Sequence, residues 1–200
     1  MLLASIFLNL AVFSFSRLGL SAGGALLLLT SSVVGGLINI PISRRRVSYR
    51  QPEAIPFFSF FFYYPPQVRY QVLCINVGGA IIPVLFSLYL LLTRAPLGRT
   101  IVAVLVVTLV SKALARVVPG VGISLPTFIP PLVAALSAVL ISPGNAAPVA
   151  YVAGALGTLI GADLLNLRAI RKLEAQVVSI GGAGVFDGIF LVALVASLLS

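Results

Sequence analysis

The sequence predicts an all-α fold, a polytopic bundle of transmembrane helices with about seven spans. Hydrophobic residues make up 60% of the chain and charged residues 8%, whereas about a quarter of the residues in a soluble domain are charged. The mean hydropathy of +1.17 is spread along the sequence rather than concentrated in one anchor. The 200 residues suffice for six or seven spans of about 20 residues, so residues 1–200 are expected to form a single integral membrane domain.

Apolar stretches separated by charges and prolines give the positions of these spans. We expect the first at about residues 1–16, since a signal peptide would carry positive charge before its apolar run. If that run does not span, the bundle has six spans. Basic and aromatic residues 43–70 form the one long loop, expected to lie at the headgroup boundary or, alternatively, to act as a lid. The other spans are expected at about residues 20–42, 71–92, 100–118, 125–141, 148–167 and 177–199.

The basic residues are distributed unequally between the two sides of this bundle. Ten lie on the side of the connections after the second, fourth and sixth spans, with Lys112 and Arg116 in the last half of the fourth span itself. Three, Arg17, Arg94 and Arg99, lie on the other side. Because cytoplasmic loops carry the excess of Lys and Arg, we expect a cell-membrane protein with its N-terminus and the 168–175 connector in the cytoplasm and its C-terminus outside. The net charge of +9 then indicates contact with lipid headgroups rather than nucleic acid, since it is split among loops.

The residue types present exclude several kinds of catalysis. The chain has no histidine and one cysteine, Cys74, so zinc, haem and iron–sulfur sites lose their usual ligands and a Ser-His-Asp triad is impossible. We therefore predict no metal site and no cofactor. Any chemistry must use carboxylates, hydroxyls, lysine or a hard cation.

Two aspartates in the last two spans are the strongest candidates for catalytic residues. Asp163 and Asp187 are the only acidic residues inside predicted spans, and a carboxylate in hydrocarbon costs roughly 3 kcal/mol. On straight helices with a rise of about 1.5 Å per residue, they lie about 7 Å and 15 Å from the connector. A pair therefore requires the glycine-rich break at residues 181–184 to bring them level. Carboxylates that meet share a proton, and they can act as the acid and base of peptide hydrolysis or carry protons or a cation.

Asparagines beside glycines and prolines in the second and third spans predict a polar cavity. Broken helices with a nearby amide form midplane sites in transporters. The alternative is close helix packing in which Asn39 and Asn76 bridge helices. Lys112 is expected to extend to the cytoplasmic surface, the alternative being a counter-ion for an aspartate. The candidate residues of a polar or substrate-binding cavity are Asn39, Pro41, Asn76, Gly78, Gly79, Pro83, Gly182 and Gly184.

Five local patterns in the chain resemble those of known membrane proteins. They are Gly-Gly-Leu-Ile-Asn39-Ile-Pro41, Asn76-Val-Gly-Gly-Ala-Ile-Ile-Pro83, Pro126-Thr-Phe-Ile-Pro130-Pro-Leu-Val-Ala-Ala, Gly161-Ala-Asp163-Leu-Leu-Asn-Leu and Gly182-Ala-Gly-Val-Phe-Asp187-Gly-Ile-Phe. Over roughly residues 35–190 the chain resembles the archaeal and bacterial family called domain of unknown function 1614, which has no established activity.

The chain is also similar, more weakly, to intramembrane aspartyl proteases of the presenilin and signal-peptide-peptidase type. Those proteins carry one aspartate on each of two consecutive helices, and their orientation matches a cytoplasmic connector. The resemblance implies that Asp163 and Asp187 are catalytic. Two departures are that Phe186 stands where that family has Gly and Ala162 where it has Tyr.

Three functions fit the sequence. The first is an intramembrane aspartyl protease-like hydrolase acting on membrane-embedded peptides through Asp163 and Asp187. The second is a proton- or cation-coupled transporter or channel that uses the same aspartates with Asn39 and Asn76. The third is a non-catalytic structural membrane protein. The expected partners are the lipid bilayer and either a transmembrane peptide or a small cation.

Overall fold

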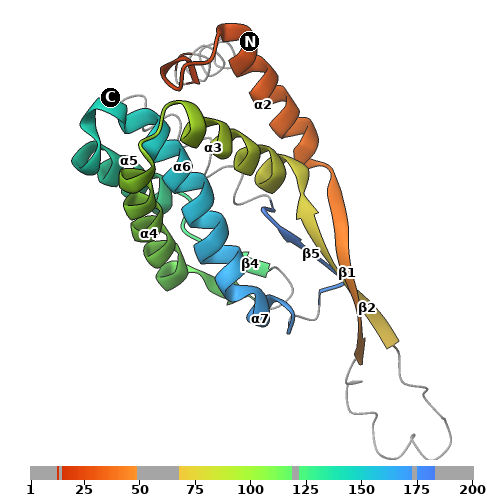
Figure 1. Ribbon diagram of the computed structural model, residues 1–200. Coiled ribbons are helices and arrows are strands. Elements are labelled where there is room, and N and C mark those ends of the chain that lie inside the picture. The colour runs from red at the N-terminus through yellow and green to blue at the C-terminus, as the bar shows by residue number, and fades with distance from the viewer. Residues whose placement is uncertain (1–12, 14, 49–67, 119–121, 173–174, 183–200) are drawn as a thin grey trace, which may run out of the picture.

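The computed structural model describes residues 13, 15–48, 68–118, 122–172 and 175–182, and it is mostly helical with two small sheets (Figure 1). The α-helices are α2 (Ala22–Gly36), α3 (Ile82–Thr93), α4 (Leu97–Leu114), α5 (Ile129–Ile141), α6 (Ala146–Thr158) and α7 (Leu167–Ile170). The strands are β1 (Asn39–Ser48), β2 (Val68–Asn76), β3 (Arg116–Val118), β4 (Gly122–Ser124) and β5 (Val177–Ile180). Two π-helical turns, η1 (Val77–Ile81) and η3 (Leu159–Asp163), and two 3-10 turns, η2 (Pro143–Asn145) and η4 (Leu164–Asn166), join them.

Helix α6 forms the centre of the helical part and packs against α3, α4 and α5. Almost all of its residues are buried, and most of them are alanine, glycine or valine. Small side chains let helix backbones approach closely. At Gly157, a Cβ atom would lie 2.7 Å from Cβ of Val107 on α4, so this crossing admits only glycine without a shift. The core therefore depends on small residues along one helix.

The larger sheet has the strand order β1–β2–β5 and extends away from the helices (Figure 1). Strands β1 and β2 are antiparallel, with Asn39 opposite Asn76 at the end nearest the helices. The register shifts between Pro41 and Ser43, which suits a residue that lacks a backbone N–H. Strand β5 pairs in parallel with β2 from Val72 to Ile75. The sheet thus begins where α2 ends and where η1 starts.

These strands correct the sequence prediction, because an all-α fold does not include them. The predicted span 20–42 is helical only to Gly36, and the predicted span 71–92 is extended as far as Asn76. Pro41 cannot donate the backbone hydrogen bond of a helix and disfavours helical geometry in the residue before it. The β-branched residues and tyrosine of β2 fit a pleated strand, and both ends of the predicted loop 43–70 belong to the hairpin.

The remaining predicted spans differ from the structure mainly at their ends. Helix α4 stops at Leu114 and is followed by strand β3. Helix α5 begins at Ile129, so Pro126 precedes it while Pro130 and Pro131 lie in its first turn, where proline is tolerated. Residues 177–180 form β5 rather than the start of a helix. Most of the predicted span 1–16 and residues 183–199 lie outside the described part of the chain.

Two described helical segments, Leu97–Leu114 and Pro143–Ile170, are long and apolar enough to cross a membrane by length and composition. In the second, an 18-residue apolar stretch is 78% buried within the protein, as the core helix of a soluble protein also is, so the seven-span count is not confirmed. The apolar helices Ala22–Gly36, Val77–Thr93 and Ile129–Ile141 are shorter.

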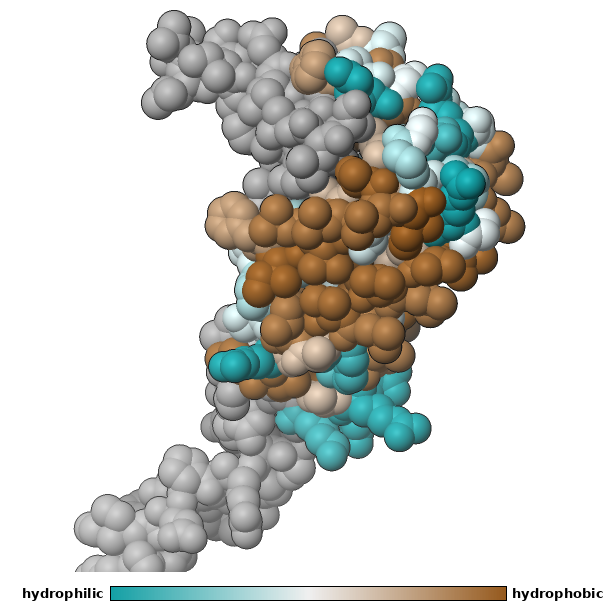
Figure 2. All heavy atoms as spheres, turned by 90° about the vertical axis from the view of Figure 1, so that its left-hand side faces the viewer, coloured by the Kyte–Doolittle hydropathy of each residue, from teal (hydrophilic) through white to brown (hydrophobic). Residues whose placement is uncertain are grey.

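Figure 2 shows a broad hydrophobic band on the outside of the helices, with hydrophilic atoms gathered at its two ends. Exposed leucines of α4 and α5, among them Leu109 and Leu140, contribute large apolar side chains to the outer surface.

Candidate functional site

Asp163 is the last residue of η3, the π-helical turn that follows α6, and 7% of it is exposed. The backbone N–H of Gly181 donates a hydrogen bond of 2.7 Å to its Oδ2 atom. At Gly161 this turn packs closely on α4. A Cβ atom at that position would overlap the carbonyl oxygen of Thr108, so the close contact depends on glycine. Single π-helical turns occur often at functional sites. The geometry therefore holds one carboxylate in a buried, irregular part of the main helix.

Gly181 joins this carboxylate to the first half of the chain. Its φ of +71° lies in the left-handed region, which favours glycine. A Cβ atom at this position would lie 2.7 Å from Cβ of Ala80 in η1, and a Cβ atom at Gly79 would overlap the carbonyl oxygen of Gly181. The turn after β5 therefore packs its backbone directly on η1 while its N–H reaches η3.

Asn76 anchors η1 through all the polar atoms of its side chain. Its Oδ1 accepts from the N–H of Gly79 over 2.7 Å, as a helix N-cap does. Its Nδ2 donates to the carbonyl of Gly36 over 2.7 Å and to Oδ1 of Asn39 over 3.1 Å. Asn39 also accepts a hydrogen bond from Oγ of Ser179 on β5. The two asparagines thus connect the end of α2, the start of η1 and strand β5.

The structure brings together four of the predicted cavity residues. Asn39, Asn76, Gly78 and Gly79 meet where the sheet joins the helices, and Gly181 links this group to Asp163. Gly78 contacts α2 so closely that a Cβ atom would overlap the carbonyl oxygen of Ser32. In this cluster the asparagines bridge elements, as the packing alternative expected, and the polar cavity stays a prediction.

The other predicted site residues take different positions. Pro41 lies at the irregularity in β1, and Pro83 is buried in the first turn of α3. Gly182 follows Gly181, and a Cβ atom there would meet the carbonyl oxygen of Ser179 at an ordinary 3.5 Å. Asp187 and Gly184 lie outside the described residues, so the paired-aspartate centre stays a prediction.

Lys112 contacts η4, the 3-10 turn that follows Asp163, rather than the carboxylate. Its Nζ donates to the carbonyl of Leu165 over 3.0 Å and to Oδ1 of Asn166. Asn166 in turn donates to the carbonyls of Gly161 and Ala162 over 3.2 and 2.8 Å. Among the residues that the structure describes, none forms an ion pair with Asp163. Asn166 thus binds carbonyl groups of the π-helical turn, and Lys112 binds a carbonyl of η4 and holds the Asn166 side chain.

Sequence reasoning missed Asn166, Ser179 and the specific role of Gly181. The signal for Asn166 was its position three residues after Asp163, which places both side chains near one turn of a helix. No local pattern marks Ser179, because its partner Asn39 lies 140 residues away. In the described part of the chain, no three His, Cys, Asp or Glu side chains gather into a group that would hold a metal ion. The chemistry available here is that of one buried carboxylate with amide and hydroxyl neighbours.

Comparison with protein families gives a match over most of the chain. A family model described as "Protein of unknown function (DUF1614)" matches residues 33–199, which include all five sequence patterns and both aspartates. No curated protein matches the chain, and neither does any solved structure. The resemblance to intramembrane aspartyl proteases therefore gains no support from these comparisons.

Proposed function

The chain belongs to the DUF1614 family of proteins of unknown function, and from its site we propose that it is a multi-pass membrane protein that hydrolyses membrane-embedded peptides with Asp163 and Asp187. The observation that carries this proposal is the 2.7 Å hydrogen bond between Gly181 and Asp163. Asp187 follows Gly181 by six residues in the sequence. The segment that leads to Asp187 therefore starts from a residue that is hydrogen-bonded to Asp163. The different depths of about 7 Å and 15 Å assumed that Asp187 lies on a straight helix starting near Val177. That assumption does not hold, because residues 177–180 are a strand.

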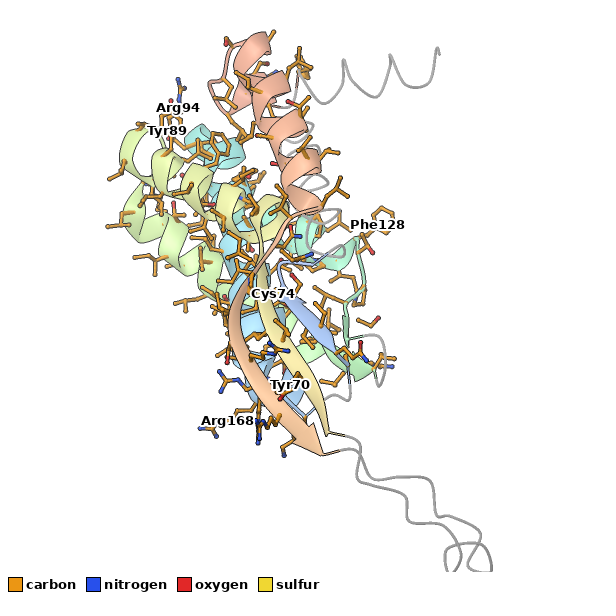
Figure 3. All side chains as sticks on the ribbon, turned by 90° about the vertical axis from the view of Figure 1, so that its right-hand side faces the viewer. Tyr70, Cys74, Tyr89, Arg94, Phe128 and Arg168 are labelled. Carbon is orange, nitrogen blue, oxygen red and sulfur yellow. The ribbon has the colours of Figure 1, made fainter. Side chains whose placement is uncertain are left out.

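The distribution of polar and apolar surface supports a position across a membrane. Large apolar side chains cover the outer faces of α3, α4 and α5, and exposed apolar areas of this extent fit a lipid environment. Figure 3 places Arg94 at one end of the helices and Arg168 at the other. These arginines belong to the two groups that the charge bias assigns to opposite sides, and the arrangement fits that orientation with Arg168 in the cytoplasm.

Strand β5 supports a peptide as the substrate. Its inner edge pairs with β2, and no other described strand pairs with its outer edge. An extended peptide can add to such an edge through backbone hydrogen bonds. Since β5 ends at Ile180, a peptide aligned with it would run directly to Gly181 and the Asp163 carboxylate. The strand thus provides a means of presenting an unfolded backbone to the proposed catalytic group.

The proposed reaction needs one ionised and one protonated carboxyl group. The carboxylate accepts a proton from water as the water oxygen attacks the peptide carbonyl carbon. The other carboxyl group donates its proton to the peptide nitrogen as the C–N bond breaks, which yields a carboxyl and an amine terminus. Hydrogen bonding from Gly181 fixes the Oδ2 atom of Asp163 and leaves its other oxygen to face the reacting groups.

The asparagine cluster favours a second candidate, a proton- or cation-coupled transporter or channel. Asn39, Asn76 and Ser179 form a line of polar side chains beside the breaks between α2, the sheet and η1. Amides and interrupted helices of this kind bind small ions in transporters. Here Asp163 would carry the proton or contact the cation, and no peptide bond would be cleaved.

One experiment distinguishes these functions. The purified protein is placed in liposomes with a doubly labelled transmembrane peptide and an internal pH dye, and Asp163→Asn and Asp187→Asn are compared with the wild type. Asparagine preserves an acceptor for the Gly181 N–H, so the fold should persist. Cleavage lost in both variants supports the protease, and proton flux lost in both without cleavage supports the transporter. Glu53→Gln, which removes an acidic residue between β1 and β2, serves as the control. Wild-type protein that neither cleaves nor conducts contradicts both functions.

A further inference from the structure

A cavity of about 450 Å³ lies at the end of the helices that carries Arg94. Three separate parts of the chain line it: Arg17 before α2, the end of α3 with Arg94 just after it, and the connection from α5 to α6 around Asn145. The cavity is far from the aspartate site. Pro148, at its edge, precedes Asp163 by 15 residues, or about 22 Å along a helix with a rise of about 1.5 Å per residue.

Arg94 is held in place by neighbours from two other segments. Gly19 has a φ of +83°, and a Cβ atom there would overlap the guanidinium group of Arg94. The side chain therefore passes over a backbone position that has no side chain of its own. Nδ2 of Asn145 donates to the backbone carbonyl of Arg94 over 3.0 Å. These contacts position the charged group at the cavity rather than leaving it to extend freely into solvent.

Arg17 supplies a second guanidinium group to the same cavity, with its Cζ 5.4 Å from the ring centre of Phe13. Neither arginine forms an ion pair with any residue in the described ranges. Asp163, the one acidic residue that the structure describes, is bound to Gly181 at the distant site. Two cations that share a cavity without an acidic neighbour favour an anion there. Guanidinium groups bind phosphate oxygens through paired hydrogen bonds, which a hydrated ammonium group does not provide.

We propose that this cavity binds the phosphate headgroup of an anionic phospholipid through Arg17 and Arg94. The outer face of α3 next to the cavity favours a lipid over free phosphate. Leu85 and Leu92 lie four residues before and three after Tyr89, on the same helix face, and they are 61% and 78% exposed. Acyl chains can cover these leucines while the headgroup reaches the arginines. The hydroxyl-bearing end of α3, at Tyr89 and Thr93, provides further polar contacts.

Native mass spectrometry of the full chain in a neutral detergent tests this site. Phosphatidylglycerol is compared with phosphatidylcholine of the same acyl chains, and the wild type should bind the anionic lipid more tightly. Arg94→Gln and Arg17→Gln should each weaken that binding by about tenfold or more, the effect of losing one charged hydrogen bond. Arg99→Gln removes an exposed arginine near the same end that does not line the cavity, and it should leave binding unchanged.

A second variant distinguishes a specific binding site from nonspecific electrostatic attraction. Gly19→Ala keeps every charge but displaces the Arg94 guanidinium, so it should weaken phosphatidylglycerol binding as well. Should this variant fail to fold, Arg94→Lys keeps the charge without the paired hydrogen bonds and should also bind more weakly. Equal losses for Arg99→Gln and Arg94→Gln, equal binding of both lipids, or inorganic phosphate binding as tightly as the lipid would overturn the proposal. Asp163→Asn should retain the lipid, so this result is independent of the proposed catalytic function.

Discussion

Asn76 lies directly opposite Asn39 in the antiparallel register, and its Nδ2 donates to Oδ1 of Asn39 over 3.1 Å. This pair closes the end of the β1–β2 hairpin that meets the helices. Because Asn76 also binds the carbonyl of Gly36 and the N–H of Gly79, one side chain joins the end of α2 to the start of η1. The position of η1 relative to β5, and through Gly181 relative to Asp163, depends on this connection.

Replacement of Asn76 by alanine should lower the free energy of unfolding by about 1–3 kcal/mol, since the Gly79 N–H and the Gly36 carbonyl lose their buried partner. Cys74 provides the measurement. It is the single cysteine of the chain and is 5% exposed, so a thiol-reactive dye labels it only when the protein opens. The midpoint temperature of labelling should fall in Asn76→Ala.

Ser31→Ala is the matched control for this substitution. Ser31 donates only to carbonyls of its own helix and is exposed, so its loss should change stability by less than about 0.5 kcal/mol. Equal labelling midpoints for Asn76→Ala and the wild type would show that the amide does not connect α2 with η1.

The sequence predicts the local parts of this structure better than the long-range ones. Apolar runs are sufficient to locate α4 and α6, because helix formation depends on neighbouring residues. The β2–β5 pairing joins residues about 100 positions apart, such as Val72 and Val177, and no local pattern encodes it. Pro41 is compatible with extended structure, but within an apolar stretch a proline also fits a broken transmembrane helix. The apolar composition of the sequence thus led to the prediction of helices at positions where the chain forms strands.

The candidate site was predictable in its residues more than in its connections. Asn39, Asn76 and Asp163 stand out because polar groups are costly in an apolar sequence. Their grouping through Gly181 depends on a left-handed backbone conformation and on contact between two glycine backbones. A glycine-rich break predicts freedom of the backbone but does not specify which carboxylate its N–H will meet.

Gly181→Ala should disrupt the aspartate site, whereas Gly182→Ala should not. Alanine at 181 must adopt a φ of +71° and place Cβ 2.7 Å from that of Ala80. Left-handed strain and steric overlap together should cost about 2–4 kcal/mol. At 182 the added Cβ meets its nearest neighbour at 3.5 Å, and the change should stay within about 0.5 kcal/mol. Cys74 labelling reports stability, and the peptide and flux assays report function. Equal effects of the two substitutions would contradict the packing of Gly181 on η1.

Gly78 of η1 packs on the backbone at the end of α2, where Gly36 lies, but these two glycines should respond oppositely to alanine. A Cβ atom at 78 would overlap backbone atoms of Ser32 and Gly36, so Gly78→Ala should destabilise the protein by about 1–3 kcal/mol. A Cβ atom at 36 has no neighbour within 4 Å, and alanine is the better helix former. Gly36→Ala should therefore leave the labelling midpoint of Cys74 unchanged or raise it. A lower midpoint in Gly36→Ala would mean that the end of α2 needs glycine for its own conformation.

Lys112→Met should reduce stability without removing the function of Asp163. The substitution leaves the Leu165 carbonyl and Oδ1 of Asn166 without their shared donor, at a cost of about 1 kcal/mol. Arg116→Gln, a change at an exposed basic residue that follows α4, should have little effect on the Cys74 labelling midpoint. The decisive comparison is with Asp163→Asn in the peptide and flux assays. If Lys112→Met abolishes activity as completely as Asp163→Asn at equal stability, the lysine acts on the carboxylate as a counter-ion. Retained activity with a lower labelling midpoint instead assigns Lys112 to the support of Asn166 and η4.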